Sequence, residues 1–275
     1  MIRKRPDSVE ILSVRVSRVT MSDTLAILES MVDSGASHHV VTVNPEFVMA
    51  SRGNSAFRDV LNSADLAVPD GIGIVLASWI LGKPIRHRVT GVDLVGQFAW
   101  RAGKRGFRFF LLGAAPGLAE RAAGALQRMN SGLGIAGTFS GSPDPSEEKE
   151  ICRRITAAAP DVLLVAYGSP NQELWIARMR GRLNVPLTIG VGGSFDFIAG
   201  VVARAPRWMQ RLGLEWFYRL LIQPERWRRM RVLPGFVLLV LKQSFTSDGR
   251  EMKSLDIRRH IAAGNTGEED RRQVS

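Results

Sequence analysis

Asp70 has the residue type and the surroundings of a general base. It stands between Pro69 and Gly71, directly after the short apolar stretch 66–68 and directly before a helical pattern. A carboxylate at that place points into the space beyond a strand, where it can take a proton from a bound hydroxyl group. The positive N-terminal end of the following helix favours the ionised form, so we expect a lowered pKa. An aspartate in front of a helix is also a common capping residue, and the sequence leaves base and cap equally open.

The basic loop Arg86, His87 and Arg88 suggests phosphate binding. A planar guanidinium holds a diphosphate through two parallel hydrogen bonds, whereas the alternative is a basic loop that only faces solvent. A structural zinc site is not expected, because no second group of His or Cys stands at ligand spacing from His87 or from the pair His38 and His39. The chain also has no Asp-x-Asp pair that would hold a divalent cation on a diphosphate. We therefore expect arginines and backbone N–H groups to bind any phosphate, without a metal or another cofactor.

Two further groups of residues follow predicted strands. Gln172 and Glu173 open a helix, and the alternative to a binding role is a surface glutamine beside an acid that complements the helix dipole. Gly192 and Gly193 leave room for a flat ring, and Asp196 behind them can accept hydrogen bonds from ribose or a base. The alternative for this second group is a plain tight turn.

The pattern along residues 39–191 indicates how these residues are brought together. Apolar stretches alternate with helical patterns, which predicts an α/β fold with mostly parallel strands. In such folds ligands bind at the carboxyl ends of the strands. We therefore expect one site at the four strand ends that carry small and polar residues, namely 42–44, 69–71, 168–173 and 190–196.

The composition is that of an ordinary globular protein, with 275 residues of which 45% are hydrophobic and 23% charged. It excludes a disordered chain, a collagen and a disulfide scaffold, the last because Cys152 is the only cysteine. The apolar run 235–241 is far shorter than the ~20 residues of a membrane-spanning helix. The N-terminal basic residues are not followed by the apolar stretch of a signal peptide. We expect a protein that stays in the cytoplasm.

Positive charge is concentrated near the C-terminus. The whole chain has a net charge of +11, and residues 201–231 hold eight arginines and two acids, a local net charge of +6. Such a field points to the phosphates of nucleic acid, anionic lipid or a phosphorylated substrate. A solvated charged face is an equally weighted alternative.

The same region has an Arg- and Trp-rich helical pattern over 206–222 and a second segment from Pro224. Its apolar residues are too numerous to face water, so we expect them to pack on the body or on lipid, with ordinary core packing covering most of the leucines. The apolar residues of the segment 206–222 are Leu212, Leu214, Trp216, Phe217, Leu220 and Leu221.

After His260 the chain is polar, and we expect disorder there.

A set of motifs in a fixed order resembles one family, the WecG/TagA/CpsF bacterial glycosyltransferases (glycosyltransferase family 26). Each motif alone is modest, but the ordered set over about 9–242 is specific. Val43 and Asn171 depart from residues common in the family, proline and lysine, which weakens any inference about the donor sugar. The motifs are Thr42-x-Asn44-Pro45-Glu46, Asn62–Leu66 followed by Pro69-Asp70-Gly71-Ile72-Gly73, Arg88-x-x-Gly91-x-Asp93-Leu94, Gly168-x-Pro170-x-Gln172-Glu173, Gly190-Val-Gly-Gly-Ser-Phe-Asp196, Arg204-Ala205-Pro206 and Gly213-Leu214-Glu215-Trp216-x-Tyr218-Arg219-Leu220.

The resemblance implies a metal-independent, inverting enzyme that transfers a sugar from a UDP-sugar to a polyprenyl-diphosphate-linked sugar for cell-surface polysaccharide. N-acetylmannosamine is the leading donor sugar, and its uronic acid and glucuronic acid are close rivals. The resemblance also implies roles for residues at matching positions. Asp70 is the general base, with Thr42 and Arg88 beside it at the catalytic centre. Thr42 and Asn44 line the donor pocket, and Arg88 and Gln172 contact the diphosphate or sugar.

The resemblance places Gly192, Gly193 and Asp196 near the nucleotide. It places Arg219, Arg226 and Arg229 at the phosphates.

The expected fold is α/β, with Rossmann-like, mostly parallel sheets, flanking helices and a helical, basic C-terminal appendage. We divide the chain into a catalytic subdomain 1–104, a nucleotide-binding subdomain 105–204, a membrane-associating appendage 205–245 and a polar tail 246–275. The expected partners are the UDP-sugar, the lipid-linked acceptor and the anionic inner face of the cell membrane, with peripheral attachment and no nucleic acid. Two other classes remain as alternatives: a basic nucleic-acid-binding protein, and a nucleotide-binding oxidoreductase, against which the missing G-x-G-x-x-G fingerprint argues.

Overall fold

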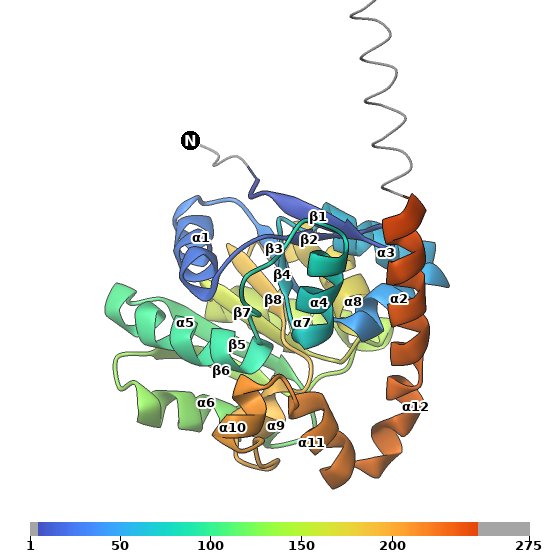
Figure 1. Ribbon diagram of the computed structural model, residues 1–275. Helices are drawn as coiled ribbons and strands as arrows, with labels where there is room; N and C mark the ends of the chain where they lie inside the picture. Colours follow the sequence, from blue (N-terminus) through green and yellow to red (C-terminus); the bar gives the residue numbers. More distant parts are fainter. Residues whose placement is uncertain (1–4, 247–275) are drawn as a thin grey trace, which may run out of the picture.

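A six-stranded sheet forms the centre of the protein (Figure 1). The computed structural model describes residues 5–246. All neighbouring strands in this sheet pair in parallel, in the order β4-β3-β8-β7-β5-β6. The predicted α/β fold with parallel strands is thus confirmed. The strands are β3 (His38–Val43), β4 (Leu66–Pro69), β5 (Arg108–Gly113), β6 (Gly134–Phe139), β7 (Val162–Ala166) and β8 (Leu187–Gly190).

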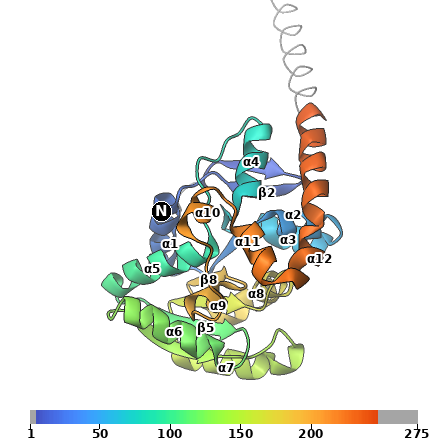
Figure 2. The same cartoon turned by 60° about the horizontal axis from the view of Figure 1, so that its bottom comes forward.

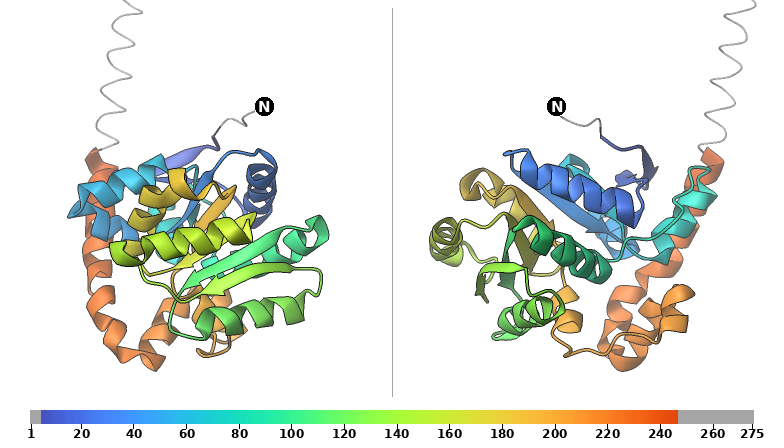
Figure 3. Two further views of the ribbon diagram at one scale, coloured as in Figure 1. Left: turned by 180° about the vertical axis from the view of Figure 1, so that it is seen from behind. Right: turned by 90° about the vertical axis from the view of Figure 1, so that its left-hand side faces the viewer.

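Helices cover both faces of the sheet, because successive residues of a strand point to opposite faces and both are apolar. Val40, for example, belongs to the core on one face and Val41 to the core on the other. The first face is covered by α1 (Met21–Asp33), α5 (Gly91–Arg105), α6 (Leu118–Met129) and α9 (Ser194–Ile198). The second face, seen from behind in Figure 3, is covered by α2 (Pro45–Arg52), α3 (Ser55–Ser63), α7 (Glu148–Ala158) and α8 (Asn171–Leu183).

A hairpin of β1 (Ser8–Ile11) and β2 (Val14–Ser17), together with α4 (Ile72–Ile80), extends the second layer. This hairpin was not predicted from the sequence. Its alternating valines and isoleucines are all buried against α3 and α4. The short helix η1 (Pro145–Glu147) leads into α7.

Several helices begin where the sequence supplies a capping side chain. Thr20 and Asp23 form a reciprocal capping box at the start of α1. Asn44 caps α2, with Pro45 in its first turn, and Thr90 caps α5. Asn44 and Thr90 both lie at the candidate site described below, so these local choices also fix the geometry of the site.

The C-terminal segment consists of short helices followed by a longer one. They are α10 (Arg207–Arg211), α11 (Glu215–Ile222), η2 (Pro224–Arg226), α12 (Trp227–Met230) and the helical residues 232–246. The helical pattern predicted over 206–222 forms two helices, α10 and α11, because the chain turns between them at Gly213. Gly213 has φ of +73°, and a Cβ atom there would lie 2.8 Å from Ile72 Cβ, so both the turn and the close approach require glycine.

The apolar side chains of this segment are largely uncovered. No residue of α11 is buried, and Leu212 and Leu221 are 64% and 61% exposed. The expectation that core packing covers most of these leucines is therefore wrong. The helical residues 232–246 are anchored more firmly: Phe236 and Val240 are buried in the core of the second face, and the Gln243 side chain bonds to the β1–β2 hairpin.

The central sheet combines strands from both sides of residue 104, since β3 lies between β4 and β8. The division into subdomains at residues 104 and 204 stays a prediction. The predicted polar tail lies outside the described residues from 247 onward. Within residues 5–246, no helix combines the length and the apolar character needed to cross a membrane.

Candidate active site

A cavity of about 1150 Å³ lies at the carboxyl ends of β3, β4, β7 and β8. These are the four strands whose ends carry the predicted site residues, and they are neighbours in the sheet. The cavity is bounded on its other side by α11, α12 and the helical residues 232–246. Figure 2 shows α10 and α11 on this side of the sheet. Every predicted site residue lines this cavity: Thr42, Asn44, Asp70, Arg88, Gln172, Gly192, Gly193, Asp196, Arg219, Arg226 and Arg229.

Asp70 lines the cavity at the end of β4. Its backbone N–H donates to the carbonyl of Val43 at 2.8 Å, which extends the pairing of the two strands. Helix α4 begins at Ile72, its N-cap is Gly71 and no side chain caps it, so the capping role of Asp70 is excluded. Among residues 5–246, no side chain forms a hydrogen bond or an ion pair with the Asp70 carboxylate. The carboxylate is thus available to a ligand in the cavity.

The pKa of Asp70 is raised to about 7. The main cause is burial, followed by the negative charge of Glu215, and the positive charges of Arg88 and Arg219 only partly oppose them. The lowered pKa expected from the helix N-terminus is therefore wrong, because desolvation outweighs the helix dipole. A pKa near neutrality is well matched to a general base that works near pH 7.

Glu215 joins the C-terminal segment to the α/β body. Its carboxylate lies 2.7 Å from Arg88 Nη1 and 3.1 Å from Arg204 Nε. Arg204 in turn makes a bidentate pair with Asp93, at 2.6 and 2.7 Å, and Asp93 accepts a hydrogen bond from Thr90 at 2.6 Å. Arg88 also donates to the backbone carbonyl of Gln210. The network therefore holds the start of α11 against the start of α5, directly beside Asp70.

Sequence reasoning named only Arg88 from this network as a site residue. Asp93, Arg204 and Glu215 do occur in the motifs quoted above, which was the available signal. Their pairing could not be predicted, because Arg204 and Asp93 are separated by 111 residues in the chain. Arg86 and His87, the other members of the basic loop, are exposed and do not line the cavity.

Gln172 is 1% exposed and its side chain holds two loops together. Its Oε1 accepts hydrogen bonds from the N–H groups of Gly168 at 3.2 Å and Gly192 at 3.0 Å. Its Nε2 donates to Glu173 at 2.8 Å. Glu173 is fully buried and lies 2.6 Å from His39 Nε2. The alternative of a surface glutamine is therefore wrong, whereas Glu173 does lie in the first turn of α8, where an acid complements the helix dipole. Gln172 shapes the site from behind.

Gly190 sits against this buried group. A Cβ atom at Gly190 would collide with Glu173 Oε1 and would lie 2.7 Å from Gln172 Nε2. The end of β8 therefore needs glycine because two polar side chains approach its backbone closely.

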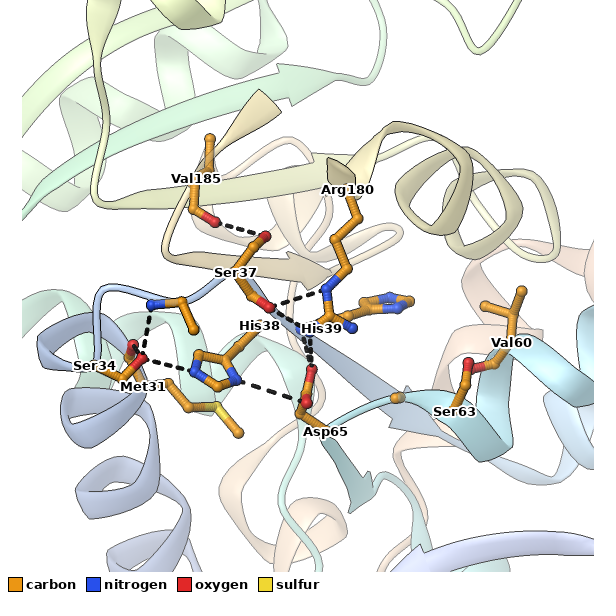
Figure 4. Close-up of polar contacts among 12 residues, drawn as sticks. Met31, Ser34, Ser37, His38, His39, Val60, Ser63, Asp65, Arg180 and Val185 are labelled. Carbon is orange, nitrogen blue, oxygen red and sulfur yellow. Dashed lines mark hydrogen bonds and ion pairs between the residues drawn. The ribbon is translucent and has the colours of Figure 1, made fainter. Parts of the chain in front are cut away.

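His38 and His39 point in opposite directions from β3, as neighbouring strand residues do. Figure 4 shows the His38 ring directed toward Asp65, whose carboxylate is 3.6 Å from His38 Nδ1 and 2.8 Å from Arg180 Nη2. This cluster lies at the start of β3, whereas the cavity lies at its end. Across residues 5–246, no group of three or more His, Cys, Asp or Glu side chains is placed to hold a metal ion.

Thr42 and Asn44 occupy the end of β3. The Thr42 hydroxyl donates to the carbonyl of Gly190 at 3.1 Å, and Asn44 accepts from the Phe47 N–H at 3.0 Å as the cap of α2. Both residues line the cavity. Each uses part of its polar capacity to hold the strand end, and the Asn44 amide N–H groups remain as donors for a ligand.

Arg219 faces Gly193 and Asp196 across the cavity. A Cβ atom at Gly193 would lie 2.8 Å from Arg219 Nη2 and 3.1 Å from Asp196 Oδ2, so these groups meet at the turn after β8. The Arg219 guanidinium also stacks over the Phe197 ring at 4.8 Å. Burial and the nearby charge of Arg226 lower the pKa of Arg219 to about 10.

Arg226 and Arg229 complete a cationic group with Arg219. Among the described residues, their only ion pair is that of Arg226 with Glu46, at 3.9 Å. The Nε of Arg226 is buried without a hydrogen-bond partner, and burial lowers the pKa of this arginine. Such under-neutralised guanidinium groups gain from an anionic ligand, and phosphate is the anion whose geometry they match.

A parallel α/β sheet whose strand ends carry a buried carboxylate and a group of under-neutralised arginines is typical of enzymes that transfer a group from a phosphorylated donor. The family model for "Glycosyl transferase WecG/TagA/CpsF family" matches residues 9–250. This protein belongs to that family and is a glycosyltransferase. The match does not indicate either alternative class, nucleic-acid-binding protein or oxidoreductase.

Curated relatives agree with the family match. The chain is 38% identical to a protein of Bacillus spizizenii over 216 residues, which cover 78% of this chain and 83% of that protein. It is 37% identical to a Bacillus subtilis protein over 74% of this chain and 79% of that protein. It is 32% identical to a Staphylococcus aureus protein over 87% of this chain and 94% of that protein. All three are named N-acetylglucosaminyldiphosphoundecaprenol N-acetyl-beta-D-mannosaminyltransferase.

The raised pKa of Asp70 predicts the pH dependence of the reaction. The base acts only when ionised, so kcat/KM should rise with pH and level off above an inflection at about 7. Glu215→Gln removes the neighbouring negative charge and should move this inflection to lower pH. Glu150→Gln is the matched control, since Glu150 also pairs with two arginines, Arg153 and Arg154, but far from the cavity. Equal inflections in both variants would contradict the assignment.

The burial of Gln172 predicts a loss of stability when its side chain is removed. Gln172→Ala leaves the N–H groups of Gly168 and Gly192 without their acceptor, which should lower the free energy of unfolding by about 1–3 kcal/mol. Asn171→Ala, at the exposed neighbouring position, should change it little. Urea unfolding measures both. A Gln172→Ala variant as stable as Asn171→Ala, yet inactive, would make Gln172 a ligand-binding residue instead.

Proposed function

We propose that this protein transfers N-acetylmannosamine from UDP-N-acetylmannosamine to the N-acetylglucosamine of a diphosphoundecaprenol-linked acceptor, with inversion at the anomeric carbon. The observation that carries the proposal is Asp70, a carboxylate with a pKa of about 7 that faces arginines across one cavity. The names of the relatives supply the sugar pair, and they favour N-acetylmannosamine over its uronic acid and glucuronic acid. The product belongs to the synthesis of a cell-surface polymer.

Asp70 serves as the general base in this proposal. It takes the proton of the acceptor hydroxyl group as the oxygen attacks the anomeric carbon of the donor. The bond from that carbon to the diphosphate breaks, and UDP leaves with the electron pair. Asp70 ends the step as a neutral carboxylic acid, which is the form that burial favours. The same burial that raises the pKa therefore assists the proton transfer.

The arginines balance the charge that develops on UDP. A transition state like an oxocarbenium ion places negative charge on the departing diphosphate, and preorganised cations stabilise it. Arg219 is suited to this role because it is partly buried and lies beside Gly193 and Asp196. Arg226 and Arg229 extend the positive field toward the diphosphate of the acceptor. Arg88 is held by Glu215, so in our proposal it sets the field at Asp70 and contacts the sugar or diphosphate beside it.

In our proposal, the remaining cavity residues contact different parts of the donor. The turn Gly192-Gly193 and Asp196 lie beside Arg219, a placement that supports nucleotide binding there. Thr42 and Asn44 lie at the end of β3, beside β4 with Asp70, and support the donor sugar. We expect the reaction to proceed with these residues and without a metal ion.

The C-terminal segment suits a peripheral site on the inner face of the cell membrane. It presents exposed apolar rings, with Trp208, Trp216 and Trp227 exposed to 60%, 42% and 55%. Exposed arginines such as Arg228 lie among them, and each basic residue near an anionic surface adds about 1 kcal/mol to attachment. A lipid-linked acceptor requires the site to open at such a surface.

Asp70→Asn tests the base. Asn has the same shape but cannot take the proton, so kcat should fall by about 10²–10⁴-fold. UDP binding, measured by calorimetry with EDTA present, should stay unchanged. Asp70 keeps its proton up to about pH 7 in the folded state, whereas an aspartate in an unfolded chain loses it near pH ~4. The stability of the wild type should therefore fall relative to Asp70→Asn as the pH rises through this range. Normal turnover by Asp70→Asn would refute the proposed base.

Trp227→Asp tests the membrane contact. Placing a charge at this exposed ring should weaken co-sedimentation with anionic phospholipid vesicles, because the ring no longer inserts and the charge is repelled. Trp100→Asp is the control, since Trp100 is equally exposed, at 53%, but lies on α5 away from the C-terminal segment. Equal vesicle binding by both variants would contradict a membrane role of the segment.

A further inference from the structure

One part of the cavity is lined by apolar side chains. Leu76 and Ile80 of α4 lie on one wall, one helical turn apart. Leu233 and Val237 of the helix 232–246 line it as well, again four residues apart. Figure 3, right, shows α4 beside this helix. We name the space that these four residues line the apolar groove.

The apolar groove is uncovered by the protein itself. Leu76, Ile80 and Val237 are 55%, 40% and 49% exposed although they line the cavity. Exposed apolar side chains gathered in a concave surface mark a binding site, because an apolar ligand gains free energy by covering them. Ordinary surface exposure would scatter such residues instead of aligning them on two facing helices.

The groove is continuous with the cationic group of the site. Arg226 and Arg229 line the same cavity and directly precede the helix that carries Leu233 and Val237. The Nε of Arg226 is buried without a hydrogen-bond partner. The complementary ligand therefore has an anionic group that continues into an apolar chain.

The size of the cavity leaves room for such a ligand beside the donor. Its volume of about 1150 Å³ lies above the upper end of the about 300–1,000 Å³ range for a pocket that binds one drug-sized molecule. The polar residues around Asp70, Gly193 and Asp196 account for one ligand, and the apolar groove extends beyond them.

We propose that the apolar groove binds the first isoprene units of the acceptor's polyprenyl chain, with the acceptor diphosphate at Arg226 and Arg229. The proposal rests on the proposed function, which supplies a lipid-diphosphate acceptor. It adds that α4 and the helix 232–246 grip the chain itself, so the lipid is recognised by the protein as well as by the membrane.

Neighbouring residues on the same helices separate this proposal from general contact with a bilayer. Leu238 is 68% exposed and Trp79 is 61% exposed, yet neither lines the cavity. Insertion into a membrane depends on Leu238 at least as much as on Val237. Binding in the groove depends on Val237 and not on Leu238.

Calorimetry with farnesyl diphosphate and inorganic diphosphate, on the full chain without vesicles and with EDTA, tests the groove. The wild type should bind farnesyl diphosphate at least about tenfold more tightly than diphosphate, because the groove buries isoprene carbons. Val237→Asp and Ile80→Asp, from the two walls, should each lose this preference. Leu238→Asp should keep it. Unchanged UDP binding shows that each variant is folded.

Equal affinity of the wild type for the two probes would overturn the proposal, as would equal losses in Val237→Asp and Leu238→Asp. The proposed function fails separately, because binding of farnesyl diphosphate requires no sugar transfer. A protein that prefers farnesyl diphosphate through Val237 but does not transfer N-acetylmannosamine supports the groove and refutes the proposed reaction.

Discussion

The pairing of Glu215 with Arg88 and Arg204 is the interaction on which the site depends. Exposed ion pairs contribute little to stability, but these side chains are only 20–28% exposed and are linked through a bidentate contact to Asp93. No buried side chain secures α11. The ion-pair network therefore holds α11 in place, a role that buried apolar side chains have in most helices. It also places the arginines of the following segment over the strand ends.

The same network sets the chemistry of Asp70. The negative charge of Glu215 raises the pKa of this carboxylate, and the positive charge of its partner Arg88 lowers it, with burial as the largest cause of the raised value. The position of the C-terminal segment and the proton affinity of Asp70 are thus coupled. If the segment moved away, the cavity would lose Arg219, Arg226 and Arg229 together with the negative charge of Glu215 that helps to raise the pKa of Asp70.

The parallel sheet makes this arrangement possible because it gathers distant residues at one edge. β8 lies between β3 and β7, so the turn Gly192-Gly193 and Asp196 in the following α9 line the same cavity as Thr42 and Gln172. Behind them the buried pair of His39 and Glu173 fixes Gln172. Polar groups this deeply buried persist only when they are bonded to one another, which gives the loops above them a defined position.

The sequence by itself determined the alternation of strands and helices, the edge at which the site lies and the residues that line it, because periodicity, capping residues and strand ends are local properties. Only the tertiary structure decided what these residues do. Asp70 does not cap its helix, and its pKa is raised because burial and Glu215, from a segment far along the chain, outweigh the effect of the local helix end. Gln172 is buried, the chain turns at Gly213, and Leu212 and Leu221 are exposed. The sequence alone did not determine these features, because burial and ion pairing depend on which distant segments meet.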